Sequence, residues 1–248
     1  MNAETLLAAT DVSRSFGGLR AVERVSLSLV RAEVHAVIGT NGAGKSTLVN
    51  VLAGEIPASG GVITLLGRDV TRWPQPRRAR AGLGRSYQRT TIFPRSTVFE
   101  NCRLAAQAHH QRPWNWWTPA LRCAESVSLA RTALDKTGLA AVADRVAGTL
   151  SHGEKRQLEI AMCLATAPSV LLLDEPLAGM GPEETERMLA LLASLKDEHA
   201  ILLIEHDMDA VFRIADRITV MVNGAAIASG DPEAIRNNPE VQTAYLGT

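Results

Sequence analysis

The sequence lacks an excess of either charge, because 26 lysines and arginines balance 26 aspartates and glutamates among its 248 residues. A chain without net charge has no field of the whole molecule to attract it to nucleic acid or to an anionic membrane. Any such contact therefore requires a local patch. The hydrophobic share of 46% is large enough for a core and excludes a disordered or fibrous protein.

Cysteine and long apolar runs are also scarce. Cys102, Cys123 and Cys163 lie far apart and form no zinc-type spacing, which argues against a disulfide framework and favours a reducing compartment. No apolar run approaches the ~18 residues of a membrane span. The segment MNAETLLAAT has no basic region before an apolar one, so we expect no secretory signal. These absences favour a soluble, cytoplasmic protein.

The first third of the sequence predicts strands and turns. Hydrophobic residues alternate with serines over residues 25–29, and the turn pair Gly17-Gly18 precedes them, which together favour an antiparallel sheet. A short apolar run follows at residues 34–38. After it come a glycine-rich loop and a stretch with helical spacing at residues 45–52.

The rest of the sequence predicts helices followed by alternating strands and helices. Residues 97–150 have helical spacing and form an expected insertion. Continuous apolar runs at residues 170–173 and 200–204, with a helical stretch at 183–195 between them, indicate parallel strands buried on both faces. A final hairpin is expected around Asn223-Gly224. We therefore predict an α/β fold in one domain.

Residues 39–46, GTNGAGKS, match the pattern GxxxxGK[ST] between a predicted strand and a predicted helix. Such a loop turns its backbone N–H groups around phosphates, Lys45 reaches the β- and γ-phosphates, and the Ser46 hydroxyl ligates Mg²⁺. The alternative is a chance glycine turn, which the full spacing disfavours. The nucleotide-binding residues predicted here are Asn41, Gly42, Ala43, Gly44, Lys45, Ser46 and Thr47.

Polar residues end two of the predicted parallel strands. Asp174 and Glu175 follow residues 170–173, where an aspartate can hold Mg²⁺ and a glutamate can polarise water. His206 ends the next such strand. The alternatives are a polar loop for the acids and a structural role for the histidine.

Ser151 and Glu154 have the spacing of a capping box at the start of a helix. The helix N-terminus offers unpaired N–H groups and a positive dipole end, so it is a second possible anion site. The simpler alternative is a well-capped helix without a ligand.

These motifs together, in this order, resemble the nucleotide-binding subunit of an ABC transporter from about Leu7 to Leu246. The resemblance implies a P-loop NTPase core with an N-terminal antiparallel β-subdomain and an inserted helical subdomain. It also implies one nucleotide-binding domain over residues 1–248, with the helical subdomain at about 97–165, and ATP and Mg²⁺ as cofactors.

The resemblance assigns further roles. Phe16 matches the aromatic residue that stacks on adenine, and Gln88 matches the glutamine that contacts Mg²⁺ and the attacking water. Ser151 and Gly153 match signature residues that touch the γ-phosphate held by the opposite subunit. His206 matches the switch histidine. The catalytic set is then Glu175, His206, Gln88 and Lys45, and the metal ligands are Ser46, Gln88 and Asp174.

Two departures from the family pattern stand out. The signature normally reads LSGGQ, and here His152 replaces a glycine and Glu154 replaces the glutamine. Asp174 and Glu175 match the family's Walker-B acids. The loop after these acids normally ends in aspartate, whereas here it ends in Gly181. We expect ATP binding to persist, with an altered rate and altered communication between the ATP sites.

Within the family the sequence most resembles the ATPases of branched-chain amino-acid importers. The urea-importer ATPases share the Ser-His-Gly signature and Ala178-Gly179-Met180, so they are the alternative. The features that carry the resemblance are RSYQ at 85–88, IFP at 92–94, LEIA at 158–161, EHDM at 205–208, IRNNP at 235–239 and AYLG at 244–247.

The resemblance implies an ATP-hydrolysing dimer, homomeric or heteromeric, beneath transmembrane permease subunits at the inner face of the cell membrane. A solute-binding protein would be an indirect partner, and no nucleic acid is expected. The rival interpretations are a non-transport ABC ATPase and a module that binds ATP without hydrolysing it. Tandem cassettes or a long coiled coil would favour the former, and a lack of phosphate release would favour the latter.

Two clusters have more than one interpretation. A run of arginines is either a solvated face or a surface for lipid or a partner. A tryptophan cluster either packs locally or contacts a partner. The members are Arg72, Arg77, Arg78, Arg80, Arg85 and Arg89 in the first, and Trp114, Trp116 and Trp117 in the second.

Overall fold

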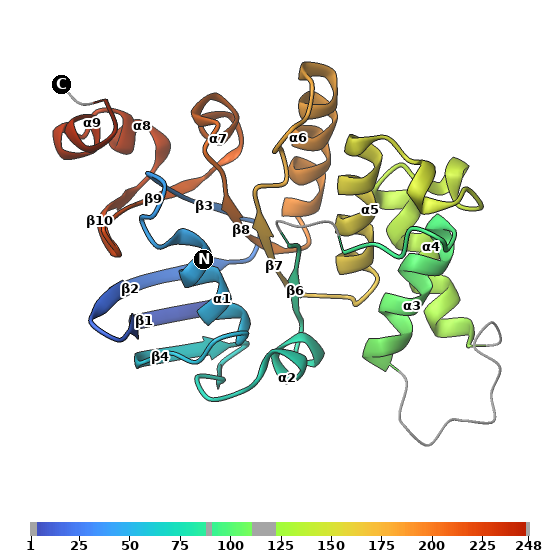
Figure 1. The fold of residues 1–248 in the computed structure, drawn as a ribbon, viewed down its shortest axis with the longest axis horizontal. Helices are drawn as coiled ribbons and strands as arrows, with labels where there is room; N and C mark the ends of the chain where they lie inside the picture. Colours follow the sequence, from blue (N-terminus) through green and yellow to red (C-terminus); the bar gives the residue numbers. More distant parts are fainter. Residues whose placement is uncertain (1–3, 88–90, 111–122, 247–248) are drawn as a thin grey trace.

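The computed structural model describes residues 4–87, 91–110 and 123–246. Arg89 and the tryptophan cluster lie outside the described residues. Within the described part, the strands form an antiparallel sheet and a mostly parallel sheet, and helices cover both faces of the latter (Figure 1). The described part has no helix that is long and apolar enough to cross a bilayer.

The N-terminal strands form the antiparallel sheet predicted from their alternation. In β2, Val25, Leu27 and Leu29 are buried while Ser26 and Ser28 are exposed. The strand order is β2-β1-β4-β5. Their bounds are β1 Thr5–Phe16, β2 Leu19–Val30, β4 Gly60–Leu65 and β5 Arg68–Asp69.

The second sheet has the order β10-β9-β3-β8-β7-β6, and its neighbours are parallel except for the β9–β10 hairpin. Every residue of β3, β7 and β8 is buried, as their continuous apolar runs predict. The bounds are β3 Val34–Gly39, β6 Leu83–Arg85, β7 Val170–Asp174, β8 Ala200–Ile204, β9 Arg217–Val222 and β10 Ala225–Gly230.

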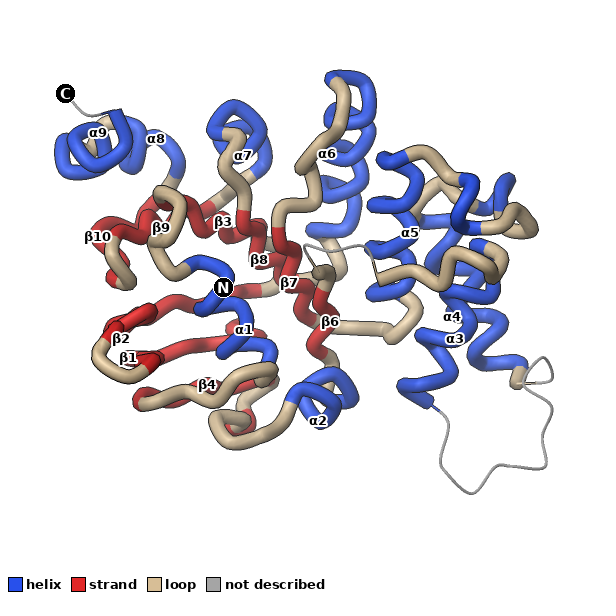
Figure 2. Tube along the Cα trace, viewed as in Figure 1, coloured by secondary structure: helices blue, strands red, loops and turns tan. Residues whose placement is uncertain are grey.

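Helix α1 (Lys45–Ala53) lies between the two sheets, as Figure 2 shows. Its Leu48, Val51 and Leu52 share one hydrophobic core with strands of both sheets. Because this core fixes α1 against β3, the loop between them is held from both ends. The other helices of this half are α2 Gln75–Arg80, α6 Pro182–Lys196, α7 Met208–Ile214, α8 Pro232–Arg236 and α9 Pro239–Leu246.

The predicted helical insertion consists of α3 (Val98–His110) and α4 (Ala124–Lys136), which pack on α5 (His152–Leu164) at one end of the molecule (Figure 1). Short 3₁₀ turns lie at Ala140–Val142 and Ala147–Thr149. Small residues let these helices approach closely.

The three cysteines are free, as their spacing predicts. Cys102 on α3 and Cys163 on α5 are buried, and burial raises the pKa of each thiol to about 12. Both are therefore inert as thiolates at neutral pH.

Candidate nucleotide-binding site

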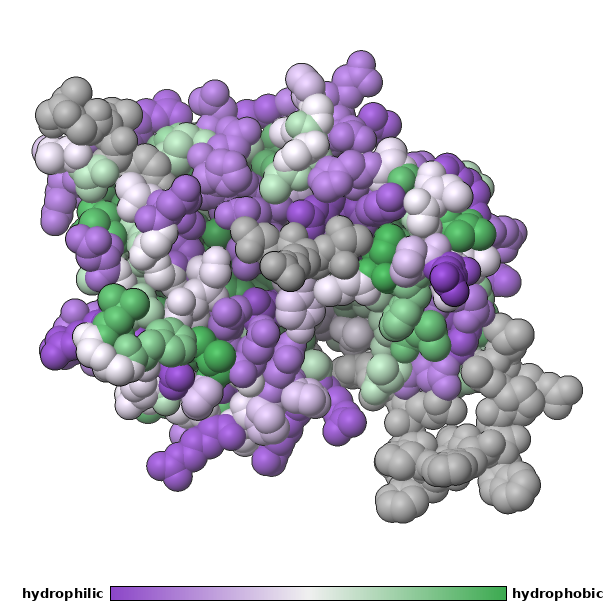
Figure 3. Space-filling model, in the orientation of Figure 1, coloured by the Kyte–Doolittle hydropathy of each residue, from purple (hydrophilic) through white to green (hydrophobic). Residues whose placement is uncertain are grey.

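A cavity of about 520 Å³ opens where β3 ends and α1 begins. Its volume lies within the ~300–1,000 Å³ of ordinary ligand pockets. Exposed apolar residues flank it at the β1–β2 turn, where Figure 3 shows apolar surface. The lining residues are Phe16, Leu19, Arg20, Ala21, Asn41, Gly42, Ala43, Gly44, Lys45, Ser46, Thr47, Glu175, Asn223 and Gly224.

The phosphate loop is packed against two other turns. Gly44, at φ +98, would place a Cβ atom 2.2 Å from the carbonyl oxygen of Ala21, so no side chain fits there. The Gly224 N–H donates to the Ala43 carbonyl at 3.0 Å, and the Glu23 N–H donates to the Gly224 carbonyl at 2.8 Å. The loop is therefore fixed in shape without any ligand.

Lys45 lies inside this loop, with 7% of its surface exposed. Its Nζ atom donates to the carbonyls of Gly39 at 2.6 Å and Thr40 at 3.1 Å. Burial lowers the pKa of Lys45, and the nearby carboxylates of Glu175 and Asp174 partly oppose that shift. The ammonium is thus held at the floor of the cavity beside two acids.

Asp174 ends β7 and is 3% exposed. Its backbone N–H donates to the Ser86 hydroxyl at 3.2 Å, while its buried Oδ1 has no hydrogen-bond partner among the described residues. Burial raises its pKa, and the carboxylate of Glu175 raises it further. A buried carboxylate oxygen without a donor is suited to a cation ligand.

Glu175 follows directly and adopts the left-handed conformation, with φ +51. Its Oε1 lies 3.9 Å from Nδ1 of His206, whose side chain is 63% exposed. A non-glycine residue in this conformation is strained, and such strain is common at functional sites. Glu175 lines the wall of the cavity.

Glu205 follows β8 directly and contacts the loop after β7. It is 1% exposed, and its Oε1 accepts the Leu177 N–H at 2.8 Å. Its Oε2 accepts the His206 N–H at 3.3 Å. Burial raises the pKa of Glu205, and the two backbone donors oppose that shift.

The signature residues lie at a different cavity. Ser151 caps α5: its hydroxyl accepts the Glu154 N–H at 3.1 Å, and the Glu154 carboxylate accepts the Ser151 N–H at 2.7 Å. The predicted capping box is confirmed. Ser151 and Gly153 line a cavity of about 220 Å³ together with Met180 and Arg187.

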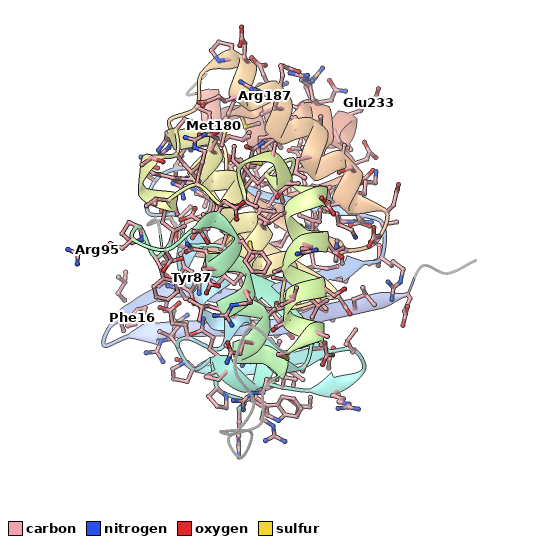
Figure 4. The ribbon with its side chains drawn as sticks, turned by 90° about the vertical axis from the view of Figure 1, so that its right-hand side faces the viewer. Phe16, Tyr87, Arg95, Met180, Arg187 and Glu233 are labelled. Atoms are coloured by element: carbon pink, nitrogen blue, oxygen red, sulfur yellow. The ribbon has the colours of Figure 1, made fainter. Side chains whose placement is uncertain are left out.

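One labelled residue of each cavity can be followed in Figure 4. In Figure 4, Phe16, which lines the phosphate-loop cavity, and Met180, which lines the signature cavity, project from the same edge of the view. One chain therefore carries two separate cavities, one at the phosphate loop and one at the signature residues. Gln88, the remaining predicted site residue, lies outside the described residues.

The motifs did not reveal several residues at the site. Asn223 and Gly224 were expected only as a hairpin turn, and their positive φ angles of 48° and 86° fit that turn. Their place in the cavity depends on β9 lying beside β3, which no local pattern predicts. Ser86 and Glu205 likewise act through contacts distant in sequence.

The fold and the cavity define a P-loop nucleotide-binding protein. The sequence model described as "ABC transporter" matches residues 22–178, and the model described as "Branched-chain amino acid ATP-binding cassette transporter" matches residues 227–248. The chain belongs to the ABC transporter family.

Curated relatives and solved structures agree. The chain is 46% identical to the high-affinity branched-chain amino acid transport ATP-binding protein LivG of Salmonella typhimurium, over 98% of each chain. It is 42% identical to BraF of Pseudomonas aeruginosa, which carries the same description, again over 98% of each. A nucleotide-free ATP-binding cassette from an ABC transporter superposes with a TM-score of 0.87 at 30% identity, covering 99% of this chain and 100% of that one. The predicted fold class is confirmed.

Proposed function

We propose that the chain is the ATP-hydrolysing subunit of an ABC importer that takes up branched-chain amino acids through partner membrane subunits. The near full-length similarity to LivG and BraF supports the substrate class. The convergence of Lys45, Asp174 and Glu175 at the phosphate-loop cavity carries the proposal of hydrolysis.

The protein residues fit ATP with Mg²⁺. The described residues contain no group of three or more His, Cys, Asp or Glu side chains that could cage a metal ion. Mg²⁺ usually binds through one or two protein ligands and the phosphates of its substrate, so no cage is needed. The Ser46 hydroxyl oxygen and the unpartnered Oδ1 of Asp174 are the protein ligands available to Mg²⁺. Bound Mg²⁺ would neutralise charge on the phosphates.

Each predicted side chain has a proposed task. Lys45 leaves the Gly39 and Thr40 carbonyls to donate to the phosphates, and the backbone N–H groups of Asn41 to Thr47 surround them. Phe16, 47% exposed at the cavity edge, stacks on adenine. Glu175 accepts a proton from the attacking water, and His206 and Gln88 orient that water and the γ-phosphate.

The two separate cavities, one at the phosphate loop and one at the signature residues, support a dimer. We propose that Ser151 and Gly153 of one subunit close over the nucleotide held by the phosphate loop of the other. The signature helix then directs its positive N-terminal end at a γ-phosphate. Residues 1–248 act as one nucleotide-binding domain, with a helical subdomain at about 97–165 inserted in its core. The dimer sits beneath permease subunits at the inner membrane face.

The test has two parts. Phosphate release by the purified chain, with and without Mg²⁺, measures hydrolysis directly. The complex is then purified from native membranes in mild detergent, reconstituted with the solute-binding protein, and assayed with leucine or urea. Stimulation of ATP hydrolysis by leucine supports the proposal, whereas stimulation by urea alone transfers the chain to the urea importers. A chain without phosphate release is a binding module.

A further inference from the structure

The signature loop, which here means residues 151–153 at the N-terminus of α5, touches the loop 177–181 that follows β7 in the same chain. The Nε2 atom of His152 lies 3.0 Å from the carbonyl oxygen of Ala178. A carbonyl oxygen only accepts, so the ring donates through a protonated Nε2. This contact fixes both the tautomer and the position of the histidine that replaces the family's usual glycine.

The backbone of Gly179 leaves room for that ring. A Cβ atom on Gly179 would lie 3.1 Å from Nε2 and 3.5 Å from Cδ2 of His152. The residue also has φ +75, which disfavours any larger side chain. The histidine in one loop and the glycine in the other are therefore complementary in shape.

A second contact joins the same two segments. A Cβ atom on Gly153 would lie 2.5 Å from Oε1 of Glu184, so the glycine backbone packs directly on that carboxylate. The Oε2 atom of Glu184 accepts the Gly181 N–H at 3.4 Å. Glu184 therefore touches the signature loop and the end of the loop 177–181 at once.

The start of the loop 177–181 is hydrogen-bonded to Glu205, the residue directly after β8. The Leu177 N–H donates to Glu205, and Glu205 also accepts the His206 N–H. A chain of direct contacts therefore runs from His152 through the loop to His206. In the proposed dimer, Ser151 and Gly153 serve one nucleotide while Glu175 and His206 serve the other, so this chain of contacts joins the two sites.

We propose that His152 is a positioning residue that couples the two ATP sites of the dimer by holding the signature loop on the loop 177–181. This inference rests on the proposed function. The donated hydrogen bond aligns the two loops, and the fit of the ring over Gly179 keeps them in register. Movement of the signature loop toward a partner's nucleotide then shifts Leu177, Glu205 and His206 of its own site.

The experiment compares wild type with His152→Ala, His152→Gln, Gly179→Ala and the double variant His152→Ala/Gly179→Ala. We measure kcat, KM and the Hill coefficient of phosphate release, together with melting temperature. Loss of the hydrogen bond in His152→Ala should lower kcat about 3- to 10-fold and bring the Hill coefficient toward 1, with little change in KM. Gln should restore most of both, because its amide nitrogen can donate to Ala178 from nearly the same place.

The double variant tests the contact itself. Gly179→Ala should lower kcat and melting temperature more in the protein with His152 than in the His152→Ala variant, because only the imidazole ring crowds the new methyl group. Arg131→Ala, an exposed change on α4, should behave as wild type. Additive effects, or a His152→Ala variant with the wild-type Hill coefficient and kcat, would overturn the inference.

The two levels of the proposal fail differently. If wild type releases no phosphate, the proposed function fails, and the melting temperatures of the same proteins still decide whether residues 152 and 179 interact. If wild type hydrolyses ATP and the effects are additive, only the coupling fails.

Discussion

The phosphate-loop half and the signature half of the site differ in how completely one chain builds them. In the first, Lys45 and Asp174 are buried and the loop is held by Ala21 and Gly224. In the second, Ser151 and His152 are exposed at the start of a capped helix. One half is thus preorganised within the chain, and the other offers an exposed surface that, in the proposed dimer, contacts the nucleotide of a second subunit. Substitutions in the two halves should therefore change turnover, nucleotide affinity and melting temperature in different ways.

Glu175→Gln should have a large and selective effect on turnover, because it removes the proposed base at the preorganised half and keeps the size of the side chain. Turnover should fall about 10²- to 10⁴-fold with much less change in ATP affinity. With hydrolysis stalled, the variant should accumulate as a dimer in MgATP and dissociate in MgADP. Light scattering after size exclusion measures this, and turnover at the wild-type rate would remove Glu175 from the mechanism.

Lys45→Ala should weaken MgATP binding roughly 10- to 100-fold and abolish turnover, because a charge-assisted donor to the phosphates is lost. The Gly39 and Thr40 carbonyls lose their donor, but a buried ammonium whose pKa is lowered by burial is removed as well, so the fold of the apo protein should stay intact. Calorimetric titration and circular dichroism measure the two effects. Wild-type nucleotide affinity in this variant would exclude the phosphate-loop assignment.

Ser151→Asn isolates the exposed half. Asn caps a helix about as well as Ser, so the melting temperature should not change. If the Ser151 hydroxyl also donates to the partner's γ-phosphate, turnover should drop about tenfold. Equal activity in the two proteins would leave Ser151 as a helix cap alone. Ser151→Ala serves as the control that loses both functions.

The smallest effect expected here is on the stability of the ligand-free protein, which Asp174→Asn should increase. Burial raises the pKa of Asp174, so its ionised form opposes folding above that pKa. The variant should therefore melt higher at neutral pH, by about 2–4 °C for each kcal/mol, and the gain should shrink as the pH falls and Asp174 takes up its proton. Melting curves across pH measure this, and a gain that grows at low pH would contradict it.

Much of this architecture follows from local patterns. The alternation over residues 25–29, the apolar runs of β3, β7 and β8, and the Asn223-Gly224 hairpin each predict the element that forms. The phosphate loop is equally readable, because its spacing is set by the geometry of a strand, a turn and a helix.

The contacts between distant segments were not predictable in the same way. No pattern shows that Lys45 is buried on its own loop, since that depends on packing around α1. In the sequence Glu205 is simply the neighbour of His206. In the fold its carboxylate accepts a hydrogen bond from the backbone N–H of Leu177, in the loop after a different strand. The role of Gly179 needs His152 beside it, and the two are brought together only by the tertiary fold.

The cysteines described above have a practical consequence. Cys102 and Cys163 are protected by burial, whereas Cys123 is partly exposed and a hydrogen bond from Ser126 lowers its pKa. A maleimide fluorophore added to the unmodified protein should therefore react at Cys123, beside α4. Two such labels in a dimer would report by energy transfer how far the helical insertions move when ATP is added, without a single substitution.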